Sequence, residues 1–131
     1  MEKNSSKKKY NVDTLLKELT LKEKASLCSG KDSWHTKEIK RFNLPPLSLS
    51  DGPHGLRKVL DTTGVFKAET SRSTCFPTAS ALGASWNKEL IYDIGCALGR
   101  ECNSLGVNIL LGPGINMKRT PLCGRNFEYF S

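Results

Sequence analysis

The sequence lacks the residue patterns that hold metals or disulfide frameworks. It has five cysteines, an odd number, and no two of them form a C-x-x-C pair. We therefore expect free thiols instead of paired cysteines. The two histidines, His35 and His54, are far apart and have no metal-ligand spacing. The sequence accordingly predicts no metal and no other cofactor.

Long apolar runs are also missing. No stretch approaches the roughly 20 apolar residues that are needed to cross a bilayer. Residues 1–10 carry charge but no apolar run follows them, so no secretory signal is recognised. We expect a cytoplasmic protein with no membrane partner.

Positive charge is the one class in excess, with a formal net charge of +7. Such a balance raises the question of nucleic-acid binding. Lys7, Lys8 and Lys9 lie in a polar leader, and the other basic residues are scattered among Asp and Glu. No helix-turn-helix, zinc-finger or RNA-module motif accompanies them. We therefore expect a solvated surface and no nucleic-acid partner.

The length of 131 residues fits one domain and is about half of the roughly 250 residues of a complete (β/α)8 barrel. Residues 1–11 are interpreted as a flexible basic leader, and residues 12–131 as the domain. A helix is predicted from Val12, with Leu15, Leu16 and Leu19 on one face. Thr20 and Glu23 have the spacing of a capping box, which predicts a second short helix that Gly30 ends.

The central part of the chain predicts alternating strands and helices. Residues 47–50 (LSLS) alternate like a short strand, and polar residues 58–74 predict a long loop. The clearest helix is expected over residues 88–105, with Asn87 as its N-cap and Gly106 as its stop. Residues 107–111 (VNILL) then predict a buried strand. This order indicates an α/β fold.

The first polar loop, residues 50–57 (SDGPHGLR), follows a predicted strand. Ligands of α/β folds collect at the carboxyl ends of strands, so the Asp51 carboxylate is a candidate acceptor for two sugar hydroxyls. Arg57 is expected either to pair with that carboxylate or to donate to ligand oxygens. The alternative for Asp51 is an Asx-turn within its own loop. His54 is interpreted as a local hydrogen-bonding partner.

The second polar loop, residues 112–131, mixes arginine, asparagine and aromatic residues. Arg125 follows a glycine and is a candidate for close approach to a ligand. The alternative is an ion pair of Glu128 with Arg125 or Arg119. The aromatic side chains of this loop are interpreted as core: Phe127, Tyr129 and Phe130.

Seven ordered motifs cover nearly everything after the leader: LTLKEK at residues 19–24, SWHT at 33–36, SDGPHGLR at 50–57, CFP at 75–77, ASWN at 84–87, LLGPGIN at 110–116 and GRNFEYFS at 124–131. In this order and spacing they resemble the N-terminal part of glycoside hydrolase family 3, in its β-glucosidase branch. Glycoside hydrolysis needs two carboxyl groups that flank the scissile bond, and no pair in this sequence suits that work. No catalytic residue is therefore assigned.

This resemblance implies a (β/α)8 TIM-like barrel, of which the chain is an incomplete N-terminal portion, followed by an α/β sandwich domain. It implies retaining hydrolysis of terminal non-reducing β-D-glucosyl residues in small-molecule or oligosaccharide β-glucosides. Asp51 and Arg125 correspond to residues that bind the sugar in the subsite of cleavage, and Arg57 supports that site.

The family's nucleophile and acid/base lie further downstream than this sequence reaches. The resemblance therefore implies a fragment that binds substrate and is inactive alone, with the C-terminal part of the enzyme as its partner. The alternative is a sugar-binding or regulatory remnant that has no catalytic role. Oligomeric state and the preferred linkage are left open.

Overall fold

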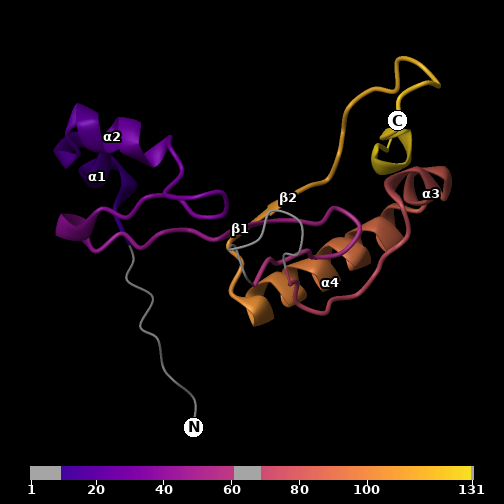
Figure 1. Cartoon of the computed structure of the whole chain (residues 1–131), viewed down its shortest axis with the longest axis horizontal. Helices are drawn as coiled ribbons and strands as arrows, with labels where there is room; N and C mark the ends of the chain where they lie inside the picture. Colours follow the sequence, from indigo (N-terminus) through magenta and orange to yellow (C-terminus); the bar gives the residue numbers. More distant parts are fainter. Residues whose placement is uncertain (1–9, 61–68, 131) are drawn as a thin grey trace, which may run out of the picture.

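A computed structural model describes residues 10–60 and 69–130 of the chain. Two helical regions lie on either side of a short parallel sheet (Figure 1). The α/β class is as expected, and the sheet in the described residues is small and open. In chain order the elements are α1 (Val12–Glu18), α2 (Leu21–Leu27), η1 (Lys40–Phe42), β1 (Leu49–Asp51), α3 (Ala79–Ala84), α4 (Lys88–Leu105), β2 (Ile109–Leu111) and η2 (Asn126–Glu128).

Tyr10, the first described residue, is hydrogen-bonded to a later part of the N-terminal region. Residues 1–9 of the expected leader lie outside the described residues. The Tyr10 hydroxyl donates a 2.6 Å hydrogen bond to the Asn43 carbonyl. Asn11 is the N-cap of α1, and its side chain accepts from the Thr14 amide. The first helix therefore begins at Val12, as the sequence predicts.

The capping box at the start of α2 is confirmed, because Thr20 and Glu23 exchange their side-chain and backbone hydrogen bonds. The helix ends at Leu27 with Cys28 as its C-cap, before the expected stop at Gly30. Glu23 also receives two hydrogen bonds from Arg41, which follows 18 residues later. One carboxylate thus joins the start of α2 to η1.

The shared Glu23 carboxylate makes the N-terminal region sensitive to acid. Its hydrogen bonds with Arg41, and next with the Thr20 amide, lower the pKa of Glu23 from 4.5 to about 2. Because the folded-state pKa is depressed, the stabilisation is complete above pH 4.5 and is lost as the pH falls towards 2. We expect the thermal midpoint of the wild type to fall across this window more than that of Glu23→Gln. Equal losses measured by circular dichroism would contradict the expectation.

Both strands are shorter than expected: β1 is displaced towards the C-terminus, and β2 begins two residues later than predicted but ends at Leu111 as expected. They pair in parallel, with Leu49 opposite Ile109 and Asp51 opposite Leu111. Asp51 is therefore the last residue of β1, and the expectation that it follows the strand is wrong. Asp51 belongs to the strand because it lies opposite Leu111 of β2, a partner about 60 residues away that its local sequence does not reveal.

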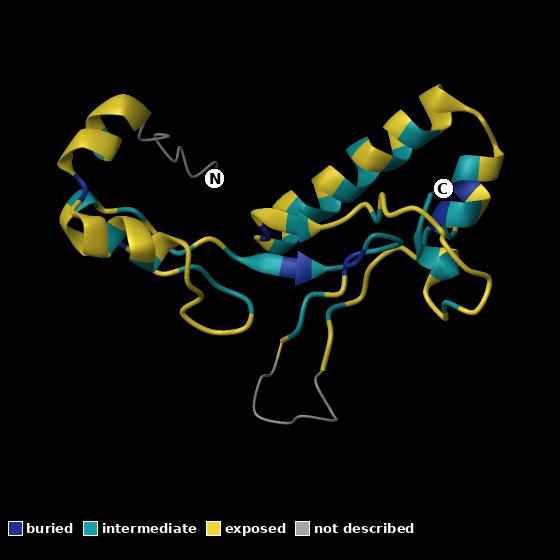
Figure 2. Ribbon diagram, turned by 90° about the horizontal axis from the view of Figure 1, so that it is seen from above, coloured by how far each residue is buried: buried dark blue, intermediate teal, exposed yellow. Residues whose placement is uncertain are grey.

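The expected burial of residues 107–111 is wrong for most of the segment. Val107 is buried, but the side chains of Ile109 and Leu111 are 38% and 46% exposed. The physical reason is that β2 pairs only with β1 among the described residues. A central parallel strand has two neighbours and two covered faces. Figure 2 shows how much of the chain beyond β1 is intermediate or exposed.

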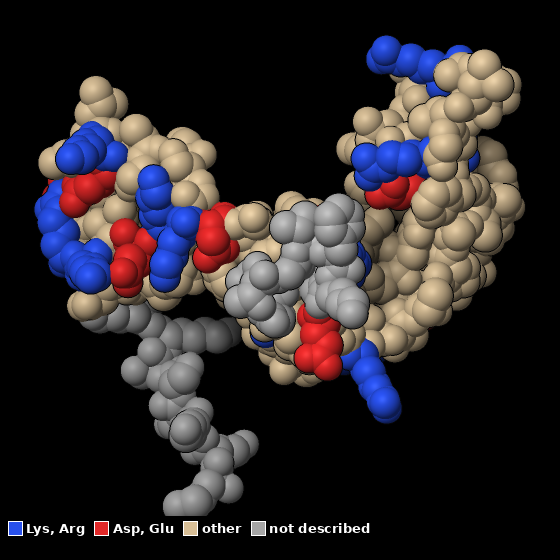
Figure 3. Space-filling view, viewed as in Figure 1, with Lys and Arg blue, Asp and Glu red and all other residues tan. Residues whose placement is uncertain are grey.

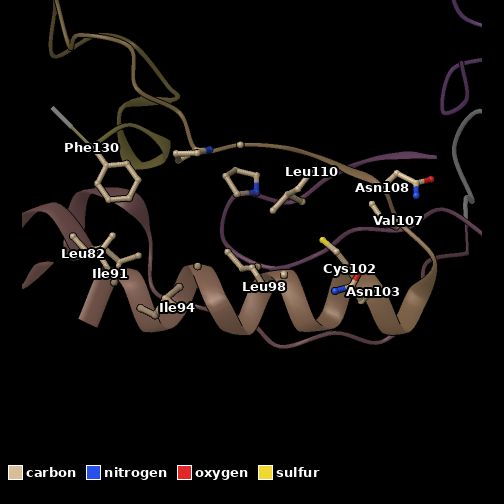
Figure 4. Close-up of a pocket in the computed structure, with 15 residues that line it drawn as sticks. Leu82, Ile91, Ile94, Leu98, Cys102, Asn103, Val107, Asn108, Leu110 and Phe130 are labelled. Carbon is tan, nitrogen blue, oxygen red and sulfur yellow. The ribbon is translucent and has the colours of Figure 1, made fainter. Parts of the chain in front are cut away.

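The long helix α4 confirms its sequence prediction at both ends. Asn87 caps it by accepting from the Leu90 amide, and Gly106 ends it with φ 68°. Its apolar face turns towards β2, where Leu98 and Cys102 face Leu110 across a groove (Figure 4). The groove has a volume of about 470 Å³. The helix thus lies against the sheet with part of its apolar face uncovered.

Lys and Arg side chains are interspersed with Asp and Glu on the N-terminal region (Figure 3). Within residues 10–60 and 69–130, no helix has the length and apolar character that a membrane span requires. Part of the predicted loop over residues 58–74, residues 61–68, lies outside the described residues. At its ends, Val59 and Thr70 form an antiparallel bridge.

Candidate functional site

The candidate site lies where β1 and β2 end. Parallel strands place their carboxyl ends at one edge of a sheet, so the segments after Asp51 and Leu111 start side by side. Gly112 packs on Pro53, and a Cβ at Gly112 would lie 3.0 Å from the Pro53 Cα. The two polar loops of the sequence are therefore in direct contact.

The first loop has a backbone path that depends on glycine. The Arg57 amide donates to the Asp51 carbonyl at 2.9 Å, which closes residues 51–57 into a compact turn. Gly52 and Gly55 have φ of 131° and 144°, values that side chains with a Cβ rarely adopt. Leu56 is only 2% exposed and anchors the loop from within. Asp51 and Arg57 are thus the first and last residues of one turn with a fixed backbone, and their side chains extend from its two ends.

The side chains of these two residues face each other loosely. Asp51 Oδ2 lies 3.9 Å from Arg57 Nη1, and the side chains are 47% and 60% exposed. The described residues provide no hydrogen bond from the loop backbone to the Asp51 carboxylate, so they do not form the Asx-turn that was the alternative. The pairing with Arg57 is present, and both groups stay accessible to a ligand.

In the second loop, the Arg125 guanidinium is paired with the Glu128 carboxylate. Arg125 Nε and Nη2 donate to Glu128 at 2.6 and 2.7 Å, a bidentate pair. The pair that was expected as an alternative therefore forms with Arg125 and not with Arg119. These hydrogen bonds lower the pKa of Glu128 and raise that of Arg125. Both groups stay charged, and the Nη1 hydrogens of Arg125 lie outside the pair.

Helix α3 holds the turn that carries Arg125. The Ser80 hydroxyl donates to the Phe127 carbonyl at 2.8 Å, and η2 packs on α3. The Asn126 side chain donates to the Thr120 carbonyl at 2.8 Å. The Phe130 amide in turn donates to the Gly114 carbonyl at 3.2 Å. The loop is consequently tied both to a helix and to its own first residues.

His54 is a local hydrogen-bonding partner, as its sequence context indicates. Its Nε2 accepts from the Ala79 amide at 3.1 Å, at the start of α3. Its ring also lies 5.8 Å from the Phe127 ring, centroid to centroid. An Nε2 that already accepts a backbone hydrogen bond is poorly placed to take a proton from a substrate. His54 therefore joins the two loops instead of serving as a base.

The two loops enclose a pocket of about 450 Å³. It brings together all three candidate binding residues of the sequence, Asp51, Arg57 and Arg125. The complete lining is Asp51, Gly52, Pro53, His54, Gly55, Arg57, Leu111, Arg125, Phe127 and Glu128.

Sequence reasoning missed the exposed aromatic ring of this pocket. The sequence predicts Phe127 as core, and this prediction is wrong: its side chain is 52% exposed and lines the pocket. Tyr129 and Phe130 are half-buried, closer to the expectation. The signal that was available is local: Phe127 stands between Asn126 and Glu128 in a short turn after a glycine, where full burial is difficult.

In the part of the chain that the structure describes, no three His, Cys, Asp or Glu side chains gather as a metal-ligand set.

Comparison with known proteins finds similarity along nearly the whole chain. The model of the glycosyl hydrolase family 3 N-terminal domain matches residues 8–131. Thermostable beta-glucosidase B of Acetivibrio thermocellus is 52% identical over 122 residues. An exo-alpha-(1->6)-L-arabinopyranosidase of Bifidobacterium longum is 49% identical over 118 residues. The crystal structure of a Kluyveromyces marxianus beta-glucosidase in complex with glucose superposes with a TM-score of 0.81 at 38% identity.

The coverage of these matches is unequal. The alignments include 92%, 88% and 94% of this chain, respectively, but only 16%, 16% and 14% of the three relatives. The chain thus spans less than a fifth of the length of the proteins that it matches.

Proposed function

Because the chain belongs to glycosyl hydrolase family 3, we propose that it forms the first part of the barrel domain of a β-glucosidase-like enzyme. In this proposal the pocket between the two loops holds the sugar whose glycosidic bond is cleaved. The observation that carries it is the meeting of Asp51, Arg57 and Arg125 around one cavity of about 450 Å³. That volume lies in the usual range of small-ligand pockets, roughly 300–1,000 Å³.

The chemistry of the lining suits a neutral, hydroxylated ligand. The Asp51 carboxylate has acceptor capacity for two hydroxyls, and Arg57 and Arg125 supply donors for sugar oxygens. The exposed ring of Phe127 offers an apolar surface for the C–H face of a pyranose. Glu128 orients Arg125 through the bidentate pair, which fixes the direction of its remaining N–H groups. Binding and orientation are the work of these residues.

The bond-breaking groups are proposed to come from elsewhere in the enzyme. A retaining glycosidase needs a nucleophilic carboxylate, which attacks the sugar, and a second carboxyl group, which is protonated and donates its proton to the leaving-group oxygen. Glu128 is unsuited to the second role, because the Arg125 pair lowers its pKa and keeps it ionised. Asp51 is engaged with the sugar in this proposal. We place the nucleophile and the acid/base outside this chain, because it spans less than a fifth of the length of its relatives. An enzyme of the relatives' length that contains this chain is called the full-length enzyme below.

The substrate is proposed to be a small-molecule or oligosaccharide β-glucoside, cleaved at its terminal non-reducing glucosyl residue. Two of the relatives are named β-glucosidases, and one structure contains glucose. The arabinopyranosidase of Bifidobacterium longum is nearly as similar. The test substrates therefore form a panel of two glycosides, an aryl β-D-glucoside and an aryl α-L-arabinopyranoside. Both sugars are neutral pyranoses, which the same carboxylate and arginines recognise through hydroxyls.

A second candidate function is sugar binding without catalysis by the chain itself. It is favoured by one observation: each carboxylate of the pocket has an arginine beside it, Glu128 in a close pair at 2.6 Å and Asp51 in a loose one at 3.9 Å. Under this alternative the isolated chain folds and binds glucose with no assigned turnover. A rise in its thermal midpoint with glucose would support the alternative.

Two assays of an aryl β-D-glucoside test the main proposal. We expect no turnover by the purified 131-residue chain and clear turnover by the full-length enzyme. Rapid hydrolysis by the purified chain alone would contradict the proposal that the nucleophile and the acid/base lie outside this chain. A full-length enzyme that cleaves none of the glycosides in the panel would contradict the proposed function itself.

A further inference from the structure

Residues 73–76 lie beside the loop of residues 51–57, called the binding loop here, and form hydrogen bonds with its backbone. We call them the strap. The Ser73 hydroxyl donates to the Leu56 carbonyl at 2.6 Å. The Phe76 amide donates to the His54 carbonyl at 2.7 Å. The strap therefore bonds to the carbonyls on both sides of Gly55, at the centre of residues 51–57.

Between these two hydrogen bonds the backbones touch. An ideal Cβ on Gly55 would lie 2.2 Å from the Thr74 carbonyl oxygen, so only a glycine permits this approach. Any shift of Thr74 is consequently transmitted to Gly55 without an intervening side chain. The position of the strap decides the position of the loop that carries Asp51 and Arg57.

Glu101 of α4 holds Thr74 from the opposite side. A single carboxylate oxygen, Oε1, accepts from the Thr74 amide at 3.0 Å and also from the Thr74 hydroxyl. The other oxygen, Oε2, is buried and has no hydrogen-bond partner among the described residues. Only one oxygen of the side chain is thus used, and a glutamine would retain it.

A second tether ties the same loop to α4 one turn further along. The Lys58 ammonium group donates to the Leu105 carbonyl, an orphan acceptor at the C-terminal end of the helix. The loop is therefore fixed at its middle through Glu101 and Thr74, and just after Arg57 through Lys58. The 18-residue helix is the rigid base of both attachments.

We propose that Glu101 is a positioning residue for sugar binding, which acts through Thr74 and the strap on the loop that carries Asp51 and Arg57. The inference rests on the proposed function of the pocket. Without this attachment the loop samples additional conformations, and only a fraction of molecules has Asp51 and Arg57 placed for binding. Such a fraction raises the apparent dissociation constant in inverse proportion and leaves the bound complex unchanged.

The test compares Glu101→Leu, Glu101→Gln and the control Glu89→Leu in the full-length enzyme. Glu89 is an exposed glutamate in the first turn of the same helix. With p-nitrophenyl β-D-glucoside, we expect Glu101→Leu to raise KM about tenfold with kcat within about twofold of wild type. Glu101→Gln and Glu89→Leu are expected to keep the wild-type KM. A merely structural role would lower the yield, Tm and apparent kcat without this selective change in KM.

Hydrogen exchange provides a readout that needs no catalysis. The Arg57 amide, bonded to the Asp51 carbonyl, is expected to exchange faster in Glu101→Leu and at the wild-type rate in Glu101→Gln. An unchanged KM together with unchanged exchange in Glu101→Leu would overturn the inference, as would a Glu101→Gln variant that behaves like Glu101→Leu. If the wild-type enzyme cleaves no glycoside, the proposed function fails, and exchange in residues 51–57 still decides whether Glu101 positions the loop.

Discussion

The substitution Asp51→Asn in the full-length enzyme is expected to lower kcat/KM on the order of 10²- to 10³-fold. The carboxylate is proposed to accept hydrogen bonds from two sugar hydroxyls, and each bond to a charged group contributes about 1.5–3 kcal/mol. An amide of the same shape keeps one neutral acceptor and turns the other into a donor, so about 3–4 kcal/mol of binding is lost. Steady-state kinetics with an aryl β-D-glucoside measures this loss.

The same substitution is expected to leave stability nearly unchanged. The ion pair of Asp51 with Arg57 is long, at 3.9 Å, and half-exposed, and pairs of this kind contribute at most about 1 kcal/mol. Asp93→Asn on the exposed side of α4 is the matched control, with the same chemical change outside the pocket. A wild-type kcat/KM in Asp51→Asn, or equal losses in both variants, would remove Asp51 from the sugar site.

The starts of α1, α2 and α4 could be predicted because helix ends depend on neighbouring residues, whereas α3 and the end of α2 at Leu27 were not predicted. Asn87 and Gly106 act on the first and last turns of α4 directly, and Thr20 acts with Glu23 three residues away. Strand limits depend on a partner that is distant in sequence. The ladder of β1 with β2 therefore ends at Asp51 instead of before it.

The meeting of the two polar loops could also be anticipated, since parallel strands bring their carboxyl ends together. What the sequence could not decide is how the charges pair inside the site. Arg119 and Arg125 were both candidates for Glu128, and the short turn Asn126–Glu128 decides between them by placing Arg125 within 2.6 Å. The choice follows from turn geometry that no residue pattern specified.

The support of the loop was not foreseeable for a different reason. Thr74 and Glu101 are 27 residues apart and belong to a polar segment and a helix whose pattern indicated only an apolar face. Nothing in their spacing links them to Asp51. Their connection exists because Gly55 allows the strap backbone to approach, which only three-dimensional packing reveals.

The dependence of the loop on glycine leads to a second large effect, in Gly52→Ala. Gly52 is buried and has φ 131°, and a Cβ there would lie 2.0 Å from the Gly55 carbonyl oxygen and 2.7 Å from the Leu56 Cα. Backbone strain alone costs about 1–3 kcal/mol, and a clash with backbone atoms cannot be relieved by side-chain rotation. We expect the free energy of unfolding to fall by about 3 kcal/mol, with a decrease of several degrees in Tm.

Activity is expected to fall with stability in Gly52→Ala, because the displaced turn carries Asp51 at one end and Arg57 at the other. A displacement of about 1 Å at a binding group is enough to lower the rate on the order of 10²-fold. The matched control is Gly95→Ala in α4, where a Cβ meets no atom of its surroundings within 4 Å. Helix propensity there favours alanine by about 0.5–1 kcal/mol, so Tm should rise while KM is unchanged. The two glycine-to-alanine substitutions are therefore expected to shift Tm in opposite directions in thermal unfolding. An unchanged Tm in Gly52→Ala would contradict the backbone clash at this turn.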